Sequence, residues 1–268
     1  MMSALRHHPR MTDDESLENE LKRRTRFARL HHVASCGSTQ DLAAAELADG
    51  LSDGDRSGDA VFWADHQTGG RGRQNREWHD EPGLDLAVTF CATVRLTVPT
   101  ALPAALPVAV LQAAEPFAGL MLRIKWPNDV YLDGKKLAGV LVDRDSRRPD
   151  VYRIGIGLNV NRTGFPPPLD AIATSLALAA GRTFDRGEVL LALAERVSSM
   201  LDALEAQRHD EHEALFRARL GLLGQRVEVD AGPLHRGVLT AIDFDRLTLD
   251  DQRTVPLAIV RALRTAAE

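Results

Sequence analysis

The stretch Gly69-Gly70-Arg71-Gly72-Arg73-Gln74-Asn75-Arg76-Glu77-Trp78 places three glycines, three arginines and a tryptophan within ten residues. Arginine presents a planar fork of donors that matches carboxylate and phosphate oxygens. Glycine lets backbone N–H groups approach the same ligand closely. A solvated basic turn would account for one arginine but not for this alternation. The stretch therefore predicts a loop that binds an anion, with Trp78 as an aromatic face beside it.

Two further polar clusters follow about fifty residues later along the chain. Lys125-Trp126-Pro127-Asn128-Asp129 joins a lysine, an amide and a carboxylate at a predicted strand end, where they could pair or hold Mg²⁺ and a phosphate. In Gly134–Gly139 the adjacent lysines, Lys135 and Lys136, point to opposite sides of an extended chain. Lys136, next to the apolar residues, is the one we expect to face a pocket.

Neither of the common phosphate-binding motifs accounts for these residues. Gly70-Arg71-Gly72 supplies two glycines of a dinucleotide fingerprint, but Asn75 stands at the third position. The chain contains no G-x-x-x-x-G-K-[ST] segment. Asn159 lies in the apolar stretch Gly155–Asn161, where a ligand contact and a strand-end turn explain it equally well.

Composition narrows the class of protein. The chain has 268 residues, 44% of them hydrophobic, and its 33 basic and 38 acidic residues give a net charge of -5. The arginine clusters are therefore local, and we expect no nucleic-acid partner. Cys36 and Cys91 show no metal-type spacing and suit a reducing compartment. No signal-peptide core and no segment of membrane-spanning length is apparent, so we expect a cytoplasmic protein without a membrane partner.

Periodicity predicts alternating strands and helices followed by a small β unit. Predicted strands cover residues 30–35, 59–65, 84–94, 122–126, 130–131, 137–143 and 151–159. Predicted helices cover 38–45 with Ser38 as cap, 104–115 ended by Pro116, a segment beginning at Asp185, and 210–220. Residues 1–27 read as a disordered or weakly helical arm, and the alternation after Gly221 predicts an all-β unit.

The residues together indicate a reaction class. An arginine loop, a lysine on a neighbouring strand, a carboxylate-bearing turn and apolar walls are present, without a covalent-nucleophile constellation. This combination favours activation of a small carboxylic acid by a nucleotide, in which orientation and charge neutralisation dominate.

At this point the chain resembles the biotin protein ligases, in the form without an N-terminal DNA-binding domain. The resemblance spans about residues 30–205 and rests on six segments in order: 37–40, 67–78, 125–130, 134–143, 155–161 and 173–176. It implies an α+β fold whose central mixed or antiparallel sheet is flanked by helices, as in class II synthetases. The implied domains are a catalytic unit at 28–221 and an SH3-like β-barrel at 222–268.

The resemblance also implies a function and roles for residues. The enzyme would form biotinyl-5′-adenylate from biotin and ATP with Mg²⁺, and pass biotin to a lysine of a biotin carboxyl carrier protein domain. Biotin would contact Ser38, Thr39, Gln67, Gly70, Arg71, Gly72 and Gly139. ATP or the adenylate would contact Arg71, Arg73, Arg76, Trp78, Lys125, Asn128 and Asn159, with Asp129 on the metal. Arg73 and Lys136 would carry catalysis.

The chain departs from the family pattern at several positions. Gln40, Gly69, Asn75 and Asp143 stand where the family usually has Asn, Ala, Gly and Glu, and the segments 79–85 and 256–260 are unlike its usual sequence. Two alternatives therefore stay open. One is a non-catalytic sensor of biotin or its adenylate, and the other is a lipoate-type acyl ligase.

Overall fold

The structure, a computed structural model, describes residues 14–50 and 59–266. The part of the predicted arm before residue 14 lies outside the described residues. Of the two readings for residues 14–24, the structure shows the helix: α1 (Asp14–Arg24) buries Leu17 and Leu21 against the core.

The centre of the protein is a seven-stranded sheet in the order β1-β2-β3-β7-β6-β5-β4. Its strands are β1 (Arg29–Val33), β2 (Ala60–Ala64), β3 (Leu86–Thr93), β4 (Arg123–Lys125), β5 (Asp129–Leu132), β6 (Lys135–Arg144) and β7 (Val151–Leu158). β1 pairs with β2 in parallel, and every other neighbouring pair is antiparallel. The prediction of a mixed sheet is confirmed.

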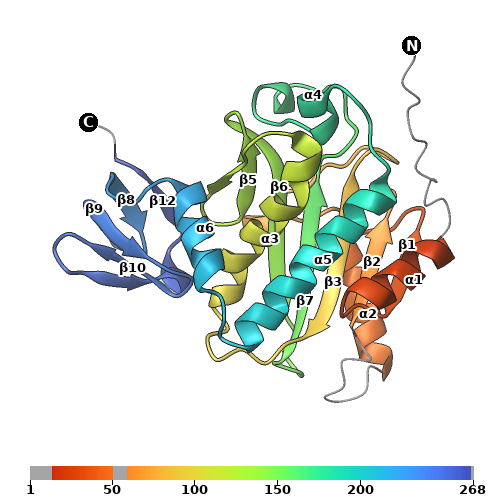
Figure 1. Cartoon of the computed structure of the whole chain (residues 1–268), viewed down its shortest axis with the longest axis horizontal. Coiled ribbons are helices and arrows are strands. Elements are labelled where there is room, and N and C mark those ends of the chain that lie inside the picture. The colour runs from red at the N-terminus through yellow and green to blue at the C-terminus, as the bar shows by residue number, and fades with distance from the viewer. Residues whose placement is uncertain (1–13, 51–58, 267–268) are drawn as a thin grey trace, which may run out of the picture.

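Strand alternation gives the sheet two different faces. On β2, Val61 and Trp63 belong to the main core, whereas Ala60 and Phe62 belong to a smaller cluster on the opposite side. The main core lies under α3 (Ala101–Ala118) and α5 (Arg186–Glu205), which pack side by side (Figure 1). The smaller cluster lies under α2 (Thr39–Gly50), which contacts β2, β3 and β7. This helix leaves the rest of that face of the sheet uncovered.

The starts of α2 and α5 agree with the predicted caps, whereas the end of α3 does not agree with its prediction. Ser38 precedes α2 and its hydroxyl accepts the Gln40 N–H at 3.3 Å, and Asp185 accepts two N–H groups at the start of α5. The prediction that Pro116 ends the third helix is wrong, because the helix continues to Ala118 and ends at left-handed Gly119. Burial of most of its apolar surface outweighs the hydrogen bond lost at the proline.

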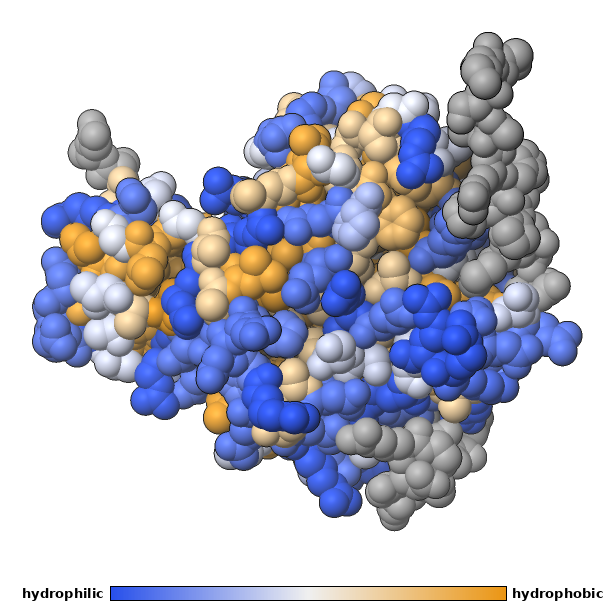
Figure 2. All heavy atoms as spheres, viewed as in Figure 1, coloured by the Kyte–Doolittle hydropathy of each residue, from blue (hydrophilic) through white to orange (hydrophobic). Residues whose placement is uncertain are grey.

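The longer α3 also revises the expectation about membrane-spanning segments. By length and composition alone its 18 residues could cross a membrane, but 72% of that window is buried within the fold. It is therefore a core helix. Figure 2 shows hydrophobic residues gathered near the centre of this face and over the C-terminal sheet, within an otherwise largely hydrophilic surface.

After β7 the chain forms three helices, α4 (Leu176–Ala180), α5 and α6 (Asp210–Leu220). A second sheet follows them, with five antiparallel strands in the order β11-β10-β9-β8-β12. Its strands are β8 (Arg226–Asp230), β9 (Leu234–Ile242), β10 (Arg246–Leu249), β11 (Thr254–Pro256) and β12 (Ala262–Thr265). This confirms the predicted C-terminal β unit. The Trp126 indole N–H donates to the Val260 carbonyl at 3.1 Å, so the unit is attached directly to the turn before β5.

Candidate active site

A cavity of about 390 Å³ opens on the part of the sheet that α2 leaves uncovered. It is lined by the first turn of α2, the arginine loop, the turn 125–129, strands β6 and β7, and residues 261–264 of the C-terminal sheet. These segments are far apart in sequence. The cavity therefore exists only in the folded chain.

The floor of the cavity is built from small residues in neighbouring strands. Gly155 pairs with Thr89 and Leu141 in one row, and Gly157 pairs with Ala87 and Gly139 in the next row on the same face. A Cβ at Gly157 would lie 2.2 Å from Trp78 Cε2, so only glycine lets the indole rest on the sheet. The glycines thus set the depth of the floor.

We expect Gly157→Ala to displace the Trp78 indole from the floor, because the added carbon and the ring cannot occupy the same space. Since Trp78 ends a surface loop, the ring can move away. The free energy of unfolding should therefore fall by less than the roughly 1–3 kcal/mol that is typical when a well-packed core is overfilled. Tryptophan fluorescence should shift to the red in this variant. Gly164→Ala, where a Cβ would meet nothing within 4 Å, is the matched control. An unchanged emission spectrum would contradict the packing described.

The arginine loop forms a short closed turn. Trp78 N–H donates to Gly70 O at 2.9 Å and Gly72 N–H donates to Arg76 O at 2.7 Å, with a 3-10 turn over Arg73–Asn75 at the tip. Gln74 has left-handed backbone there (φ 57°). The turn directs its arginines to different sides.

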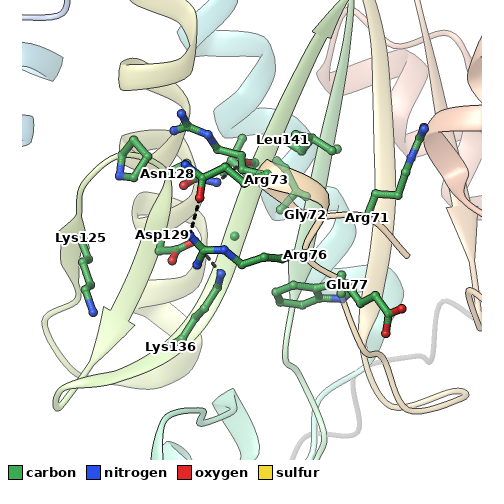
Figure 3. A pocket seen from close by; sticks show the side chains of 18 of the residues that line it. Arg71, Gly72, Arg73, Arg76, Glu77, Lys125, Asn128, Asp129, Lys136 and Leu141 are labelled. Carbon is green, nitrogen blue, oxygen red and sulfur yellow. Dashed lines mark hydrogen bonds and ion pairs between the residues drawn. The ribbon is translucent and has the colours of Figure 1, made fainter. Parts of the chain in front are cut away.

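Arg73, Arg76 and Lys136 gather around Asn128 and Asp129 (Figure 3). Lys136 Nζ lies 2.6 Å from Asp129 Oδ1, and its ammonium is 5.6 Å from the centre of the Trp78 ring. Burial lowers the pKa of Arg73, and the Asp129 carboxylate opposes this shift. The cluster carries three cations against one carboxylate, so it is suited to an anion.

Asp129 is the residue that the resemblance assigns to Mg²⁺, and it lines the cavity. Its Oδ1, although next to Lys136, has no partner with hydrogen-bond geometry among residues 14–50 and 59–266. The described residues contain no group of three His, Cys, Asp or Glu side chains that could hold a metal ion. A magnesium ion here would therefore need phosphate oxygens and water besides Asp129, which is how Mg²⁺ is commonly bound.

Other predicted cations lie away from this cluster. Arg71 points to the opposite side of the loop (Figure 3). Its guanidinium pairs with Asp41 at 2.7 Å. Lys125 contacts the Tyr131 hydroxyl at 3.3 Å. Lys135 donates to the Asp170 carbonyl at 2.8 Å and is not among the cavity residues, whereas Lys136 is. The alternation of β6 separates the two lysines.

At the other end of the cavity, Ser38, Thr39 and Gln67 lie together. The Thr39 N–H and hydroxyl contact Gln67 Oε1 at 2.8 and 3.1 Å, and its hydroxyl is also 2.8 Å from the Thr89 hydroxyl. Because Gln67 Oε1 is engaged by Thr39, its amide nitrogen remains to donate to a ligand. This end is polar and built for specific hydrogen bonds.

Two predicted site residues do not line the cavity. Asn159 is 4% exposed and donates to the Thr174 carbonyl at 2.9 Å, which corresponds to the strand-end turn reading. Gly70 packs against the backbone at the other end of the arginine loop, where a Cβ would lie 2.4 Å from the Trp78 carbonyl oxygen. The remaining predicted residues line the cavity: Ser38, Thr39, Gln67, Arg71, Gly72, Arg73, Arg76, Trp78, Lys125, Asn128, Asp129, Lys136 and Gly139.

The sequence reasoning missed several cavity residues. Gln40 follows the predicted Ser38 and Thr39 and could have been found from the start of the same helix. Arg261 and Arg264 come from the C-terminal sheet, and no sequence signal connects them with the loop. Segment 256–260, which departs from the family pattern, ends at the Val260 carbonyl that holds Trp126.

Comparison with known proteins agrees with this geometry. Residues 38–161 match the model of the biotin/lipoate A/B protein ligase family. The chain is 33% identical to the biotin--[acetyl-CoA-carboxylase] ligase of Mycobacterium tuberculosis over 253 residues, which cover 89% of this chain and 90% of that protein. The chain belongs to the biotin protein ligase family.

Two further comparisons agree with membership of this family. The bifunctional ligase/repressor BirA of Bacillus subtilis is 41% identical over 133 residues, but the match spans only 41% of that protein and 47% of this chain. The biotin protein ligase of Aquifex aeolicus, solved in complex with biotin and ATP, superposes with a TM-score of 0.75 at 27% identity. That superposition covers 90% of this chain and 100% of the Aquifex chain.

Proposed function

We propose that this protein activates biotin with ATP to biotinyl-5′-adenylate and transfers biotin to a lysine of a biotin carboxyl carrier protein domain. The observation that carries the proposal is the convergence of Arg73 and Lys136 in one cavity with Ser38, Thr39 and Gln67. One end offers hydrogen bonds to a polar ring, and the other offers positive charge to a carboxylate and a phosphate.

The first step joins the biotin carboxylate to the α-phosphorus of ATP. A carboxylate oxygen forms the new P–O bond, the bond to the β-phosphate bridging oxygen breaks, and pyrophosphate leaves. Lys136 and Arg73 would bring the two anions together and neutralise the charge that develops on the α-phosphate. Mg²⁺ held by Asp129 would supply further charge neutralisation on the phosphates. The Trp78 indole, which rests on the glycine floor, would limit the access of water to the mixed anhydride.

In the second step the amine of a carrier lysine attacks the biotinyl carbonyl, and AMP leaves. The new amide bond forms as the carbonyl–phosphate oxygen bond breaks, and the amine loses a proton to solvent or to the leaving phosphate. The relatives from Mycobacterium tuberculosis and Paracoccus denitrificans are named biotin--[acetyl-CoA-carboxylase] ligases, which supports a carboxylase as the source of the carrier domain. The free thiols of Cys36 and Cys91 suit the reducing environment of the cytoplasm.

Purified protein supplied with Mg-ATP and a biotin carboxyl carrier domain should make the carrier streptavidin-reactive and release pyrophosphate. Lipoate in place of biotin should not support pyrophosphate release. Biotin binding in calorimetry without turnover would instead support the sensor, and release with lipoate alone would support a lipoate-type ligase.

We expect Arg73→Ala to lower the rate of pyrophosphate release by about 10²-fold, because a half-buried guanidinium that would lie beside the reacting anions is lost. Arg71→Ala should lower it far less, since Arg71 is exposed and paired with Asp41 in this structure. Single-turnover pyrophosphate release at saturating biotin and ATP measures both. Equal losses in the two variants would refute the separate positions assigned to these arginines.

A further inference from the structure

Gln40 lies at the polar end of the cavity, beside Ser38 and Thr39. It is 3% exposed, it lines the cavity, and its Nε2 lies 3.2 Å from the Leu141 carbonyl and 3.3 Å from the Arg153 carbonyl. These carbonyls belong to β6 and β7, so the sheet itself fixes the position of the side chain. Both N–H groups of the amide are used, one on each strand.

Gly155 leaves room on the sheet for the Gln40 side chain. A Cβ at this residue would lie 2.6 Å from Gln40 Nε2, closer than side-chain carbons approach one another. Gly155 pairs with Thr89, whose hydroxyl contacts Thr39. The Gln40 amide therefore forms a wall directly next to the hydroxyl groups predicted to contact the biotin ring.

The amide also presents a definite chemical group. Because its nitrogen is held by two carbonyls, the end that is left is Oε1, a hydrogen-bond acceptor. Oε1 is buried and has no hydrogen-bond partner in the described part of the chain. A buried acceptor without a partner costs free energy that a ligand N–H would recover.

We propose that Gln40 is a specificity-determining residue whose amide closes the ring end of the cavity and accepts an N–H of the bound ring. This inference rests on the proposed function, and it adds a residue that recognises the ureido ring through both size and hydrogen bonding. A ring that carries a methyl group in place of that N–H should bind poorly for two reasons. It lacks the hydrogen-bond donor, and its methyl group would clash with the Gln40 amide.

The test compares biotin with its two isomers that carry one methyl group on a ureido nitrogen, using calorimetry on the full chain. Gln40→Asn shortens the side chain by one methylene. For the isomer methylated on the nitrogen that faces residue 40, the ratio of its Kd to the Kd of biotin should fall by about tenfold in this variant. Gln40→Met keeps the length without the amide and should leave that isomer excluded. An unchanged ratio in a folded Gln40→Asn variant would overturn the inference.

A second measurement holds even if one variant is destabilised. Gly155→Ala should raise the Kd for biotin about tenfold, because the new Cβ pushes the amide into the cavity, and should do so much less in the Gln40→Asn background. Equal effects in both backgrounds would show that the two residues do not act together and would overturn the inference. Absence of biotin binding to the unaltered chain would overturn the proposed function, and this inference with it.

Discussion

Replacement of Lys136 by alanine is expected to lower the rate of adenylate formation by about 10²–10³-fold. Lys136 is the ammonium of the cation cluster that lies on a rigid strand, 2.6 Å from Asp129 and over the edge of the cavity floor. Without it, Asp129 would lose its ion pair and face the phosphates with only Arg73 and Arg76 nearby, and the transition state would lose its nearest compact cation. Pyrophosphate release in a single turnover reports this step directly.

The neighbouring lysine provides the matched control. Lys135→Ala removes the same charge one residue away, from a side chain that contacts the Asp170 carbonyl outside the cavity. We expect an activity within about twofold of the unaltered chain, because exposed charges at this distance are largely screened. Comparable losses in both variants would show that net charge, and not the geometry of the cavity, governs the rate.

Replacement of Asp85 by alanine is expected to lower the free energy of unfolding by about 3–5 kcal/mol. Asp85 and Arg162 form an ion pair at 2.5 Å, with 0% and 4% of their side chains exposed. Asp85 also accepts the N–H groups of Glu81 and Val160. Its removal would leave a buried guanidinium without a counter-charge and two backbone donors without their acceptor.

Urea unfolding followed by circular dichroism measures this loss. The control is Lys22→Ala in α1, which breaks an exposed pair with Glu18 and should change the free energy by no more than about 0.5 kcal/mol. A loss below about 1 kcal/mol for Asp85→Ala would mean that water reaches Arg162 and that the pair is not buried as described.

Asp85 belongs to the segment 79–85 that departs from the family pattern, and its contacts explain how this segment still supports the site. Asp80, in the same segment, accepts the Gln67 N–H at 3.1 Å and contacts His66 at 3.0 Å. Two carboxylates thus tie the chain after Trp78 to the ends of β2 and β7. The arginine loop is held at its base although its continuation is unusual.

Local sequence was sufficient for most of the fold and for most of the residues that line the cavity. Hydrophobic periodicity and caps predicted the strands of the central sheet, the start of α2 at Ser38 and of α5 at Asp185, and the C-terminal β unit. Strand alternation predicted which of Lys135 and Lys136 would face the cavity, because the two-residue repeat of a strand does not depend on the rest of the fold. Residue types and spacing likewise predicted an anion site.

Tertiary packing decided what local patterns could not contain. Helix α3 continues through Pro116 because neighbouring elements bury its surface, and Asn159 turns to the Thr174 carbonyl because a partner becomes available there only after folding. Arg261 and Arg264 reach the cavity, and Gln40 settles on Gly155, across separations in sequence that no periodicity records. The sequence alone therefore determined which charged and polar groups the cavity has. Their distances and partners depend on side-chain packing between segments remote in the chain, and only the folded structure decided them.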